Sequence, residues 1–170
     1  MANTYQFIAS SSPTSDATSV LFSSIPQTYT DLVVRWSSRQ TGGGTFTDSN
    51  VYINSEGGAN YSWVRMSGAG TAPTGTSNSA AANWSMNNSG NNGASTANTF
   101  SSHELYLPNY TSSTVNKFGI VSHYTEANAT TAYINLAGLL RSATAAITSI
   151  GFGSGFATGT TFWLYGIKKN

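Results

Sequence analysis

The sequence predicts an all-β protein, an antiparallel β-sandwich that is jelly-roll-like. Its 170 residues contain short segments rich in aromatic and β-branched residues, separated by turns rich in glycine and asparagine, which is the pattern of strands joined by hairpins. No segment has a convincing helical period, and no alternation of strands with helices indicates a parallel sheet. We expect about ten strands, enough for two packed sheets in one domain over residues 1–170.

The first expected strands are short apolar runs that end at turn residues. They are Tyr5 to Ile8, which precedes Pro13, and Val20 to Phe22, which precedes Pro26. The cleanest alternation follows in Asp31 to Gln40, where Leu32, Val34 and Trp36 share one face and polar residues share the other. This strand is therefore expected to have an inner and an outer face. Two further strands follow the glycine turn at residues 42–44: Val51 to Ile53 and Tyr61 to Met66.

Residues Ser67 to Asn98 form an uncharged low-complexity segment of mainly glycine, alanine, serine, threonine and asparagine. We interpret it as a long insertion in the sandwich, residues 67–98, and expect few strand residues inside it. Its bulky side chains are Trp84 and Met86, two positions apart and therefore on one side of an extended chain. They are the candidate interface anchors, expected to pin the segment to another surface. For Trp84, a platform for a ligand is the alternative.

Longer strands resume after this segment. They are expected at Phe100 to Leu107, Val115 to Tyr124 and Ala132 to Arg141, with a further apolar segment from Ile147 to Phe152. The segment Ala132 to Arg141 is apolar on both faces, and a short helix is the alternative there. Ile134, Gly138 and Arg141 fit a helical period about as well.

The final strand, Thr160 to Lys169, is the most strand-like segment of the chain. Phe162 points to one face of a pleated strand, and Trp163 and Tyr165 point to the other. Because neither face is polar, we expect the strand to be buried on both sides, with Trp163 in the core like Trp36.

Charge and cysteine content exclude several classes of function. Charged residues make up only 8% of the sequence and the net charge is +1, which leaves no electrostatic footprint for nucleic acid or an anionic membrane. The chain has no cysteine, so disulfides and thiolate metal sites are excluded. The N-terminus lacks a signal-peptide pattern, and no stretch approaches the length of a membrane span. We therefore expect no nucleic-acid partner and no membrane partner.

The ionisable residues do not form a catalytic or metal-binding pattern. The chain contains six acidic residues and two histidines. His103 and Glu104 are adjacent, so they face opposite sides of a strand, and His123 and Glu126 would meet only across a turn. No histidine cluster or aspartate-rich loop has the spacing of metal ligands. We expect no catalytic residue, no metal, no cofactor and no enzymatic activity.

Two motifs stand near the two ends of the chain. The first reads Ile-Pro-x-x-Tyr-x-Asp-Leu, from Ile25 to Leu32, and the second reads Leu-Tyr-Gly-Ile-Lys, from Leu164 to Lys168. Together they resemble motifs of a widespread group of tailed-bacteriophage virion proteins. The resemblance covers the two ends and parts of the centre but not Ser67 to Asn98, and it includes no active-site residue.

The resemblance implies a β-sandwich component displayed on the surface of a virion. A fibre needs a shaft, and the chain has neither heptads nor a repetitive rod. The favoured function is therefore a capsid decoration, or cement, protein that stabilises the head shell. Its expected partners are the major capsid protein or other virion proteins, and further copies of itself in a homotrimer. The alternative is the receptor- or glycan-binding head domain of a tail or head fibre, with a host surface glycan as ligand.

Overall fold

The computed structural model describes residues 4–70, 72–128 and 132–168 and contains twelve β-strands. The larger sheet consists, in spatial order, of β1 (Tyr5–Ser11), β12 (Thr161–Ile167), β3 (Asp31–Ser38), β8 (Ser101–Leu107), β9 (Lys117–Glu126), β10 (Ala132–Arg141), β5 (Tyr61–Ala69) and β6 (Ala72–Ala81). The smaller sheet consists of β2 (Ala17–Phe22), β11 (Ile150–Phe156), β4 (Phe46–Ile53) and β7 (Trp84–Asn91). The described residues contain no helix.

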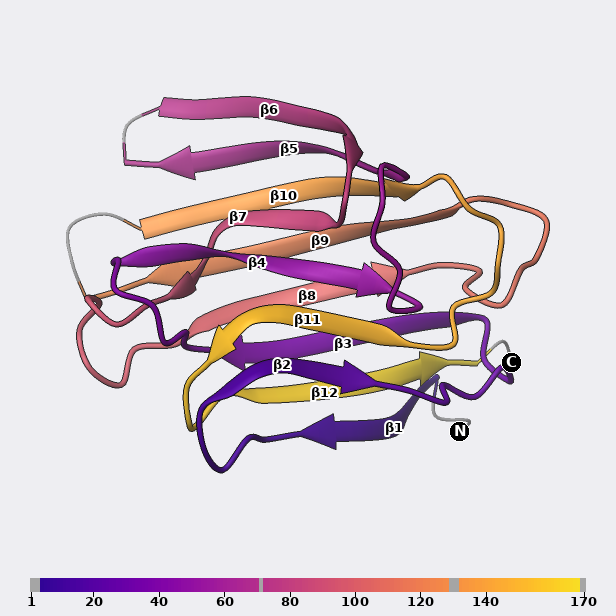
Figure 1. Cartoon of the computed structure of the whole chain (residues 1–170), viewed down its shortest axis with the longest axis horizontal. Coiled ribbons are helices and arrows are strands. Elements are labelled where there is room, and N and C mark those ends of the chain that lie inside the picture. The colour runs from indigo at the N-terminus through magenta and orange to yellow at the C-terminus, as the bar shows by residue number, and fades with distance from the viewer. Residues whose placement is uncertain (1–3, 71, 129–131, 169–170) are drawn as a thin grey trace.

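The eight-stranded and four-stranded sheets pack face to face as a β-sandwich (Figure 1). Every pair of neighbouring strands in both sheets is antiparallel. The predicted all-β antiparallel sandwich is therefore confirmed, and Ala132–Arg141 is a strand rather than a helix. In Figure 1 the smaller sheet lies over the middle strands of the larger one, whose two edges are β1 and β6.

Aromatic side chains join the two sheets at the centre of the sandwich. Trp36 of β3 and Phe162 of β12 both meet Phe152 of β11, with ring centroids 5.0 Å and 4.9 Å from that of Phe152. All three rings are buried, and tilted ring pairs of this kind stabilise a core beyond the area that they bury. Leu32 and Val34 are buried on the same face of β3 as Trp36, so the predicted inner face of this strand is confirmed.

β12 is covered on one face only. Phe162 and Leu164 are buried between the sheets, whereas Trp163 and Tyr165 are half-buried on the opposite face. The prediction that this strand is buried on both sides is wrong, and so is the placement of Trp163 in the core. The reason is that no second layer of the described residues covers the outer face of the eight-stranded sheet. Lys169, the predicted end of the strand, lies outside the described residues.

The two motifs that resemble the virion family touch each other in space. The ring of Tyr29 packs so closely on the backbone of Gly166 that a Cβ atom there would overlap ring atoms. Thr30 donates hydrogen bonds from its backbone N and its hydroxyl to the carbonyl oxygen of Ile167, at 2.9 Å and 2.8 Å. The Lys168 Nζ lies 5.8 Å from the centroid of the Tyr29 ring. The motifs therefore mark one contact, between the turn before β3 and the end of β12.

The low-complexity segment Ser67 to Asn98 is mostly strand. It contains the end of β5, all of β6 and all of β7. β7 pairs with β4 in the smaller sheet and buries small polar side chains such as Ser89 and Asn91. The expectation of few strand residues here is wrong, because hydrogen bonds between backbones form a strand without bulky or β-branched side chains.

Candidate functional site

The outer face of the eight-stranded sheet carries most of the exposed apolar side chains. Twelve large hydrophobic side chains are exposed among the described residues, and only Leu21 and Val115 lie elsewhere. The ten on this face are Tyr5, Phe7, Val64, Met66, Phe118, Ile120, Tyr124, Ile134, Leu136 and Leu140. Exposed apolar surface gathered on one face marks an interaction site in soluble proteins.

The outer face of the four-stranded sheet has a different chemistry. Neighbouring strands there place Gly151 beside Leu21, and Gly153 beside Ser19 and Asn50. Small and polar residues thus dominate this face, and Leu21 is its exposed large hydrophobic side chain. The molecule is therefore two-sided, with one apolar and one polar outer face.

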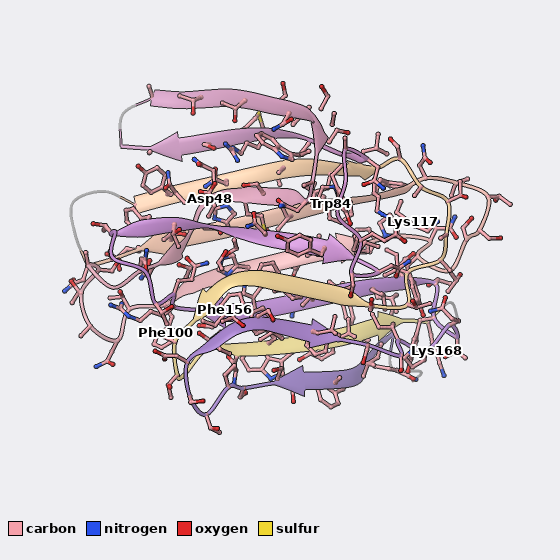
Figure 2. The ribbon with its side chains drawn as sticks, in the orientation of Figure 1. Asp48, Trp84, Phe100, Lys117, Phe156 and Lys168 are labelled. Carbon is pink, nitrogen blue, oxygen red and sulfur yellow. The ribbon has the colours of Figure 1, made fainter. Side chains whose placement is uncertain are left out.

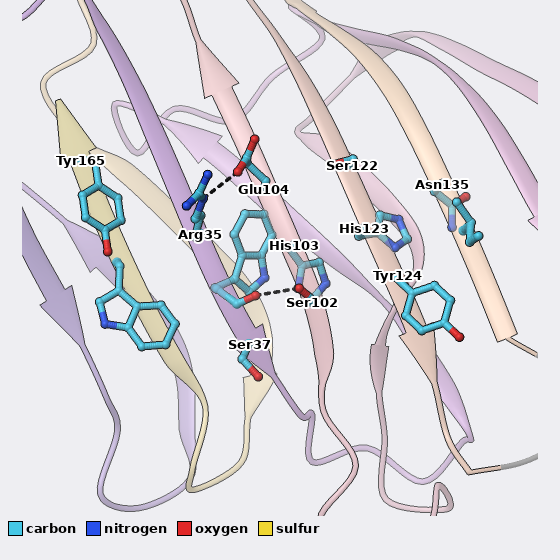
Figure 3. Close-up of a pocket in the computed structure, with 13 residues that line it drawn as sticks. Arg35, Ser37, Ser102, His103, Glu104, Ser122, His123, Tyr124, Asn135 and Tyr165 are labelled. Atoms are coloured by element: carbon cyan, nitrogen blue, oxygen red, sulfur yellow. Dashed lines mark hydrogen bonds and ion pairs between the residues drawn. The ribbon is translucent and has the colours of Figure 1, made fainter. Parts of the chain in front are cut away.

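A groove of about 530 Å³ crosses the apolar face from β12 to β10 (Figure 3). Its floor contains the short side chains of Ser37, Ser102 and Ser122, and Ser37 and Ser102 are direct neighbours across β3 and β8. All outward side chains start from the same plane of the sheet. Short side chains between long ones therefore leave a depression in its surface. The groove thus forms because serine occupies these three outward positions.

Aromatic residues form the two sides of this groove. Trp163 and Tyr165 of β12 line one side, and Tyr124 of β9 with Ile134 of β10 lines the other. The ring of Phe7 on β1 supports Tyr165 in an edge-to-face contact, with 6.1 Å between centroids. Figure 3 shows Tyr165 and Tyr124 on opposite sides of the serine floor. Both sides therefore present ring surface to a ligand.

An ion pair lies between these aromatic sides. The Arg35 Nε donates to the Glu104 Oε2 at 2.6 Å, and the two side chains keep 55% and 46% of their surface exposed. The hydrogen bond to Glu104 and its negative charge raise the pKa of Arg35 above its ordinary value. Strand register explains the pairing, because Trp163, Arg35, Glu104 and Ser122 form one row across β12, β3, β8 and β9.

A second feature, the apolar platform, lies beside the groove on β9, β10 and β5. It consists of Val64, Met66, Phe118, Ile120, Leu136 and Leu140. Gly138 opens a shallow hollow of about 650 Å³ within it. The platform contains no charged side chain, so a partner would be held there by apolar contact.

β6 continues the sheet beyond the platform as an edge strand. It pairs with β5 on one side, and no described strand pairs with its other side. Nine of its ten residues are exposed and the last, Ala81, is half-buried. The strand has no charged residue, and the pairing with β5 is regular from Ala72 to Asn78. It is thus an open edge of the kind that charges usually block in isolated proteins.

The two histidines lie on the inner face of the same sheet. His103 and His123 are direct neighbours across β8 and β9, and burial lowers the pKa of His103 to about 4 and that of His123 to about 3. The positive charges of His103 and Arg65 lower the pKa of His123 further. The predicted separation of His103 from Glu104 is confirmed, and His123 and Glu126 also point to opposite faces. Both residues are buried, and both also contribute to the lining of the groove from below.

Trp84 and Met86 are buried in the core of the sandwich, and Figure 2 labels Trp84. Trp84 is 0% exposed, its Nε1 donates to the carbonyl oxygen of Leu140 at 2.9 Å, and its ring meets Tyr61 edge to face at 5.7 Å between centroids. These side chains anchor β7 to the eight-stranded sheet of the same chain. Neither side chain is available to a partner or a ligand, so the interface-anchor interpretation is corrected to an internal one.

Sequence reasoning missed the groove because its residues stand at outward positions that read as a solvated face. In Asp31 to Gln40 the outward Arg35 has Ser37 two positions along on the same face, and in Phe100 to Leu107 the outward Glu104 has Ser102 two positions before it. The opposite signs of Arg35 and Glu104 were the available signal. Only the pairing of β3 with β8 shows that the two charges meet.

The described residues contain no group of three or more histidine, aspartate or glutamate side chains placed to hold a metal ion. No helix in that part of the chain is long and apolar enough to cross a bilayer.

No family model and no curated protein matches the chain. Two solved structures share a loose likeness with it. An alginate lyase from a Chlorella virus is 9% identical with a TM-score of 0.25, over 81% of this chain and 72% of that one. A protein of unknown function from Shewanella oneidensis MR-1 is 9% identical with a TM-score of 0.24, over 86% of this chain and 62% of that one. TM-scores this low carry no argument about function.

Proposed function

We propose that this protein is a structural component of a tailed-bacteriophage virion, a capsid decoration protein that binds the head shell and stabilises it. The resemblance of Ile25 to Leu32 and of Leu164 to Lys168 to virion proteins supports the phage setting. The observation that supports the structural role is the edge of the eight-stranded sheet at β6. No described strand pairs with this edge, and it adjoins the apolar platform.

β6 forms a regular strand although almost none of its side chains are buried. Fixing the backbone of one residue costs roughly 1–2 kcal/mol, and in most strands the burial of apolar side chains offsets this cost. The free edge of β6 presents backbone N–H and C=O groups with no charge to hinder pairing, and Pro73, which has no N–H, stands at its second position. Such an edge fits a neighbour that adds a strand to the sheet.

The apolar platform and β6 together form a continuous outer surface. Four strands spaced by about 4.8 Å and nine residues long at about 3.4 Å per residue span roughly 600 Å² from β9 to β6. A standard interface buries about 800 Å² on each partner. The platform and β6 together therefore offer about three quarters of that area, the lower end of the standard range, and the two contacts proposed below would share it.

In this proposal the two surfaces have separate partners. The platform contacts the major capsid protein, and β6 joins neighbouring copies head to tail, which closes a ring in the expected homotrimer. The polar outer face of the four-stranded sheet then faces solution, where its small uncharged side chains remain hydrated. The alternative role, a glycan-binding fibre head, relied on Trp84 as the residue that contacts the glycan. Trp84 is buried and cannot make this contact.

The first test is the copy number of the protein in purified particles, measured by quantitative mass spectrometry. A decoration protein is expected at a number comparable to that of the major capsid protein. A number comparable to that of a tail fibre would contradict the proposal.

A matched pair of substitutions tests the surface. Met66 on the platform and Leu21 on the opposite face are 62% and 54% exposed, so glutamate at either position leaves the core intact. Met66→Glu is expected to abolish cosedimentation of the purified protein with undecorated particles, because the new charge would be desolvated on binding. Leu21→Glu is expected to bind as the parent protein does. Equal binding of both variants would exclude the platform as the docking surface.

A further inference from the structure

We infer that the groove between β12 and β10 is a binding site for a neutral oligosaccharide. The inference uses a different part of the outer face from the platform, and it holds whether or not the protein decorates a capsid. It rests on three features of the groove: its rings, its ion pair and its serine floor.

The rings of Trp163 and Tyr165 supply a preformed surface for the apolar side of a sugar ring. Both side chains are half-buried, and the edge contact of Tyr165 with Phe7 restricts its motion. Aromatic rings held in this way lose little conformational entropy on binding and combine an apolar face with a polar edge. Pyranose rings have the complementary character, with C–H groups on one side and hydroxyls at the rim.

The Arg35–Glu104 pair places hydrogen-bond donors beside acceptors at the centre of the groove. Arg35 uses Nε for Glu104, and its guanidinium is otherwise half exposed. A guanidinium carries five N–H donors in a planar fork, and a carboxylate accepts at two oxygens. Adjacent hydroxyls of a sugar can therefore accept from Arg35 while donating to Glu104. The hydroxyls of Ser102 and Ser122 on the floor can donate or accept.

The balance of charge selects a neutral ligand. The charged side chains that line the groove are Arg35 and Glu104, and they neutralise each other at 2.6 Å. A uronate or sulfated sugar would need an excess of positive charge, which the groove does not offer. An amino sugar with a free ammonium would need an excess of negative charge.

The length of the groove favours an oligosaccharide over a single sugar. From β12 to β10 the groove crosses four strand spacings of about 4.8 Å, or roughly 19 Å. Its two aromatic sides, on β12 and at Tyr124, thus stand far enough apart to contact different units of one glycan chain.

The test uses the full chain on an array of neutral oligosaccharides, with glucans, mannans and galactans beside uronate-containing ones, followed by titration calorimetry on the best neutral binder. Ser122→Trp, which fills the exposed floor, is expected to abolish binding. Glu104→Gln is expected to weaken it about tenfold or more, because an ionic acceptor is lost. Ser19→Trp on the exposed face of β2, in the four-stranded sheet, is the matched control and is expected to bind as the parent protein does.

Three results would overturn the inference: no neutral glycan binding above background, stronger binding of uronate-containing glycans, or neutral-glycan binding that survives Ser122→Trp. Thermal unfolding of each variant verifies that the fold is intact. Met66→Glu separates this inference from the proposed capsid role, because it is expected to retain glycan binding while losing attachment to particles.

Discussion

β6 and β7 follow one another along the chain and are both built mainly from small polar residues, yet β6 is exposed and β7 is buried. The difference lies in two bulky side chains and in position. Trp84 and Met86 bury their side chains between the sheets and hold β7 against the larger sheet, whereas β6 has no bulky side chain and extends the larger sheet past the edge of the smaller one (Figure 1). The comparison shows that one low-complexity segment can supply both a buried strand and an exposed edge strand.

Burial of β7 is possible because its polar groups find partners. The Ser89 hydroxyl accepts from the backbone N of Ser49 at 2.9 Å, and the His103 Nε2 donates to the Ser89 carbonyl oxygen at 2.5 Å. The Asn91 side chain donates to the Glu126 carbonyl oxygen at 2.6 Å. Buried polar groups cost little stability when they are hydrogen-bonded in this way.

The strongest test of this contrast is Trp84→Ala. Removing a fully buried tryptophan is expected to lower the free energy of unfolding by about 3–5 kcal/mol, measured by urea denaturation. Thr76→Ala at an exposed position of β6 is the control, with an expected change within about 0.5 kcal/mol. A loss under about 1 kcal/mol for Trp84→Ala would mean that β7 is not anchored by its tryptophan.

Acid should loosen the contact of β7 with the larger sheet. The pKa values of His103 and His123 are lowered to about 4 and about 3, below the unfolded value of about 6.5. The unfolded chain therefore binds more protons between these values, and stability falls as pH falls from about 6.5 toward 4. We expect a loss of about 1.4 kcal/mol per pH unit for each histidine that titrates only when unfolded.

Urea denaturation at a series of pH values measures this loss. His123→Asn is expected to flatten the pH dependence, because one of the two titrating groups is removed. A stability that is constant between pH 6.5 and 4 would contradict the burial of both rings.

The smallest expected effects come from two glycines. A Cβ atom at Gly90 of β7 would overlap the side chain of Gln40, which is itself buried and donates to Ser49 at 2.6 Å, whereas a Cβ atom at Gly75 of β6 would meet nothing within 4 Å. Gly90→Ala is expected to cost about 1–3 kcal/mol through overpacking. Gly75→Ala is expected to be neutral or slightly stabilising. Similar melting temperatures for the two variants would show that β6 and β7 tolerate an added methyl group equally well.

The candidate groove was only partly predictable. The alternation in Asp31 to Gln40 correctly places Trp36 inside and Arg35 outside, and that in Phe100 to Leu107 correctly places Glu104 outside. Neither segment alone shows that Arg35 and Glu104 meet, because register between strands depends on the whole sheet. The apolar pattern on both faces of β12 predicts a core position for Trp163, whereas its side chain lies half-buried on the outer face.

Outside Ser67 to Asn98, the sequence alone predicts where the strands form and which side chains share a face, because the two-residue period of a strand is a local property of the backbone. It also contained the motifs that bring Tyr29 onto Gly166. Which face of β12 is covered, and which of β6 and β7 is buried, follows from the packing of the two sheets. Burial depends on where a second layer begins and ends, and that limit is set by the packing of the four-stranded sheet on the middle of the larger one.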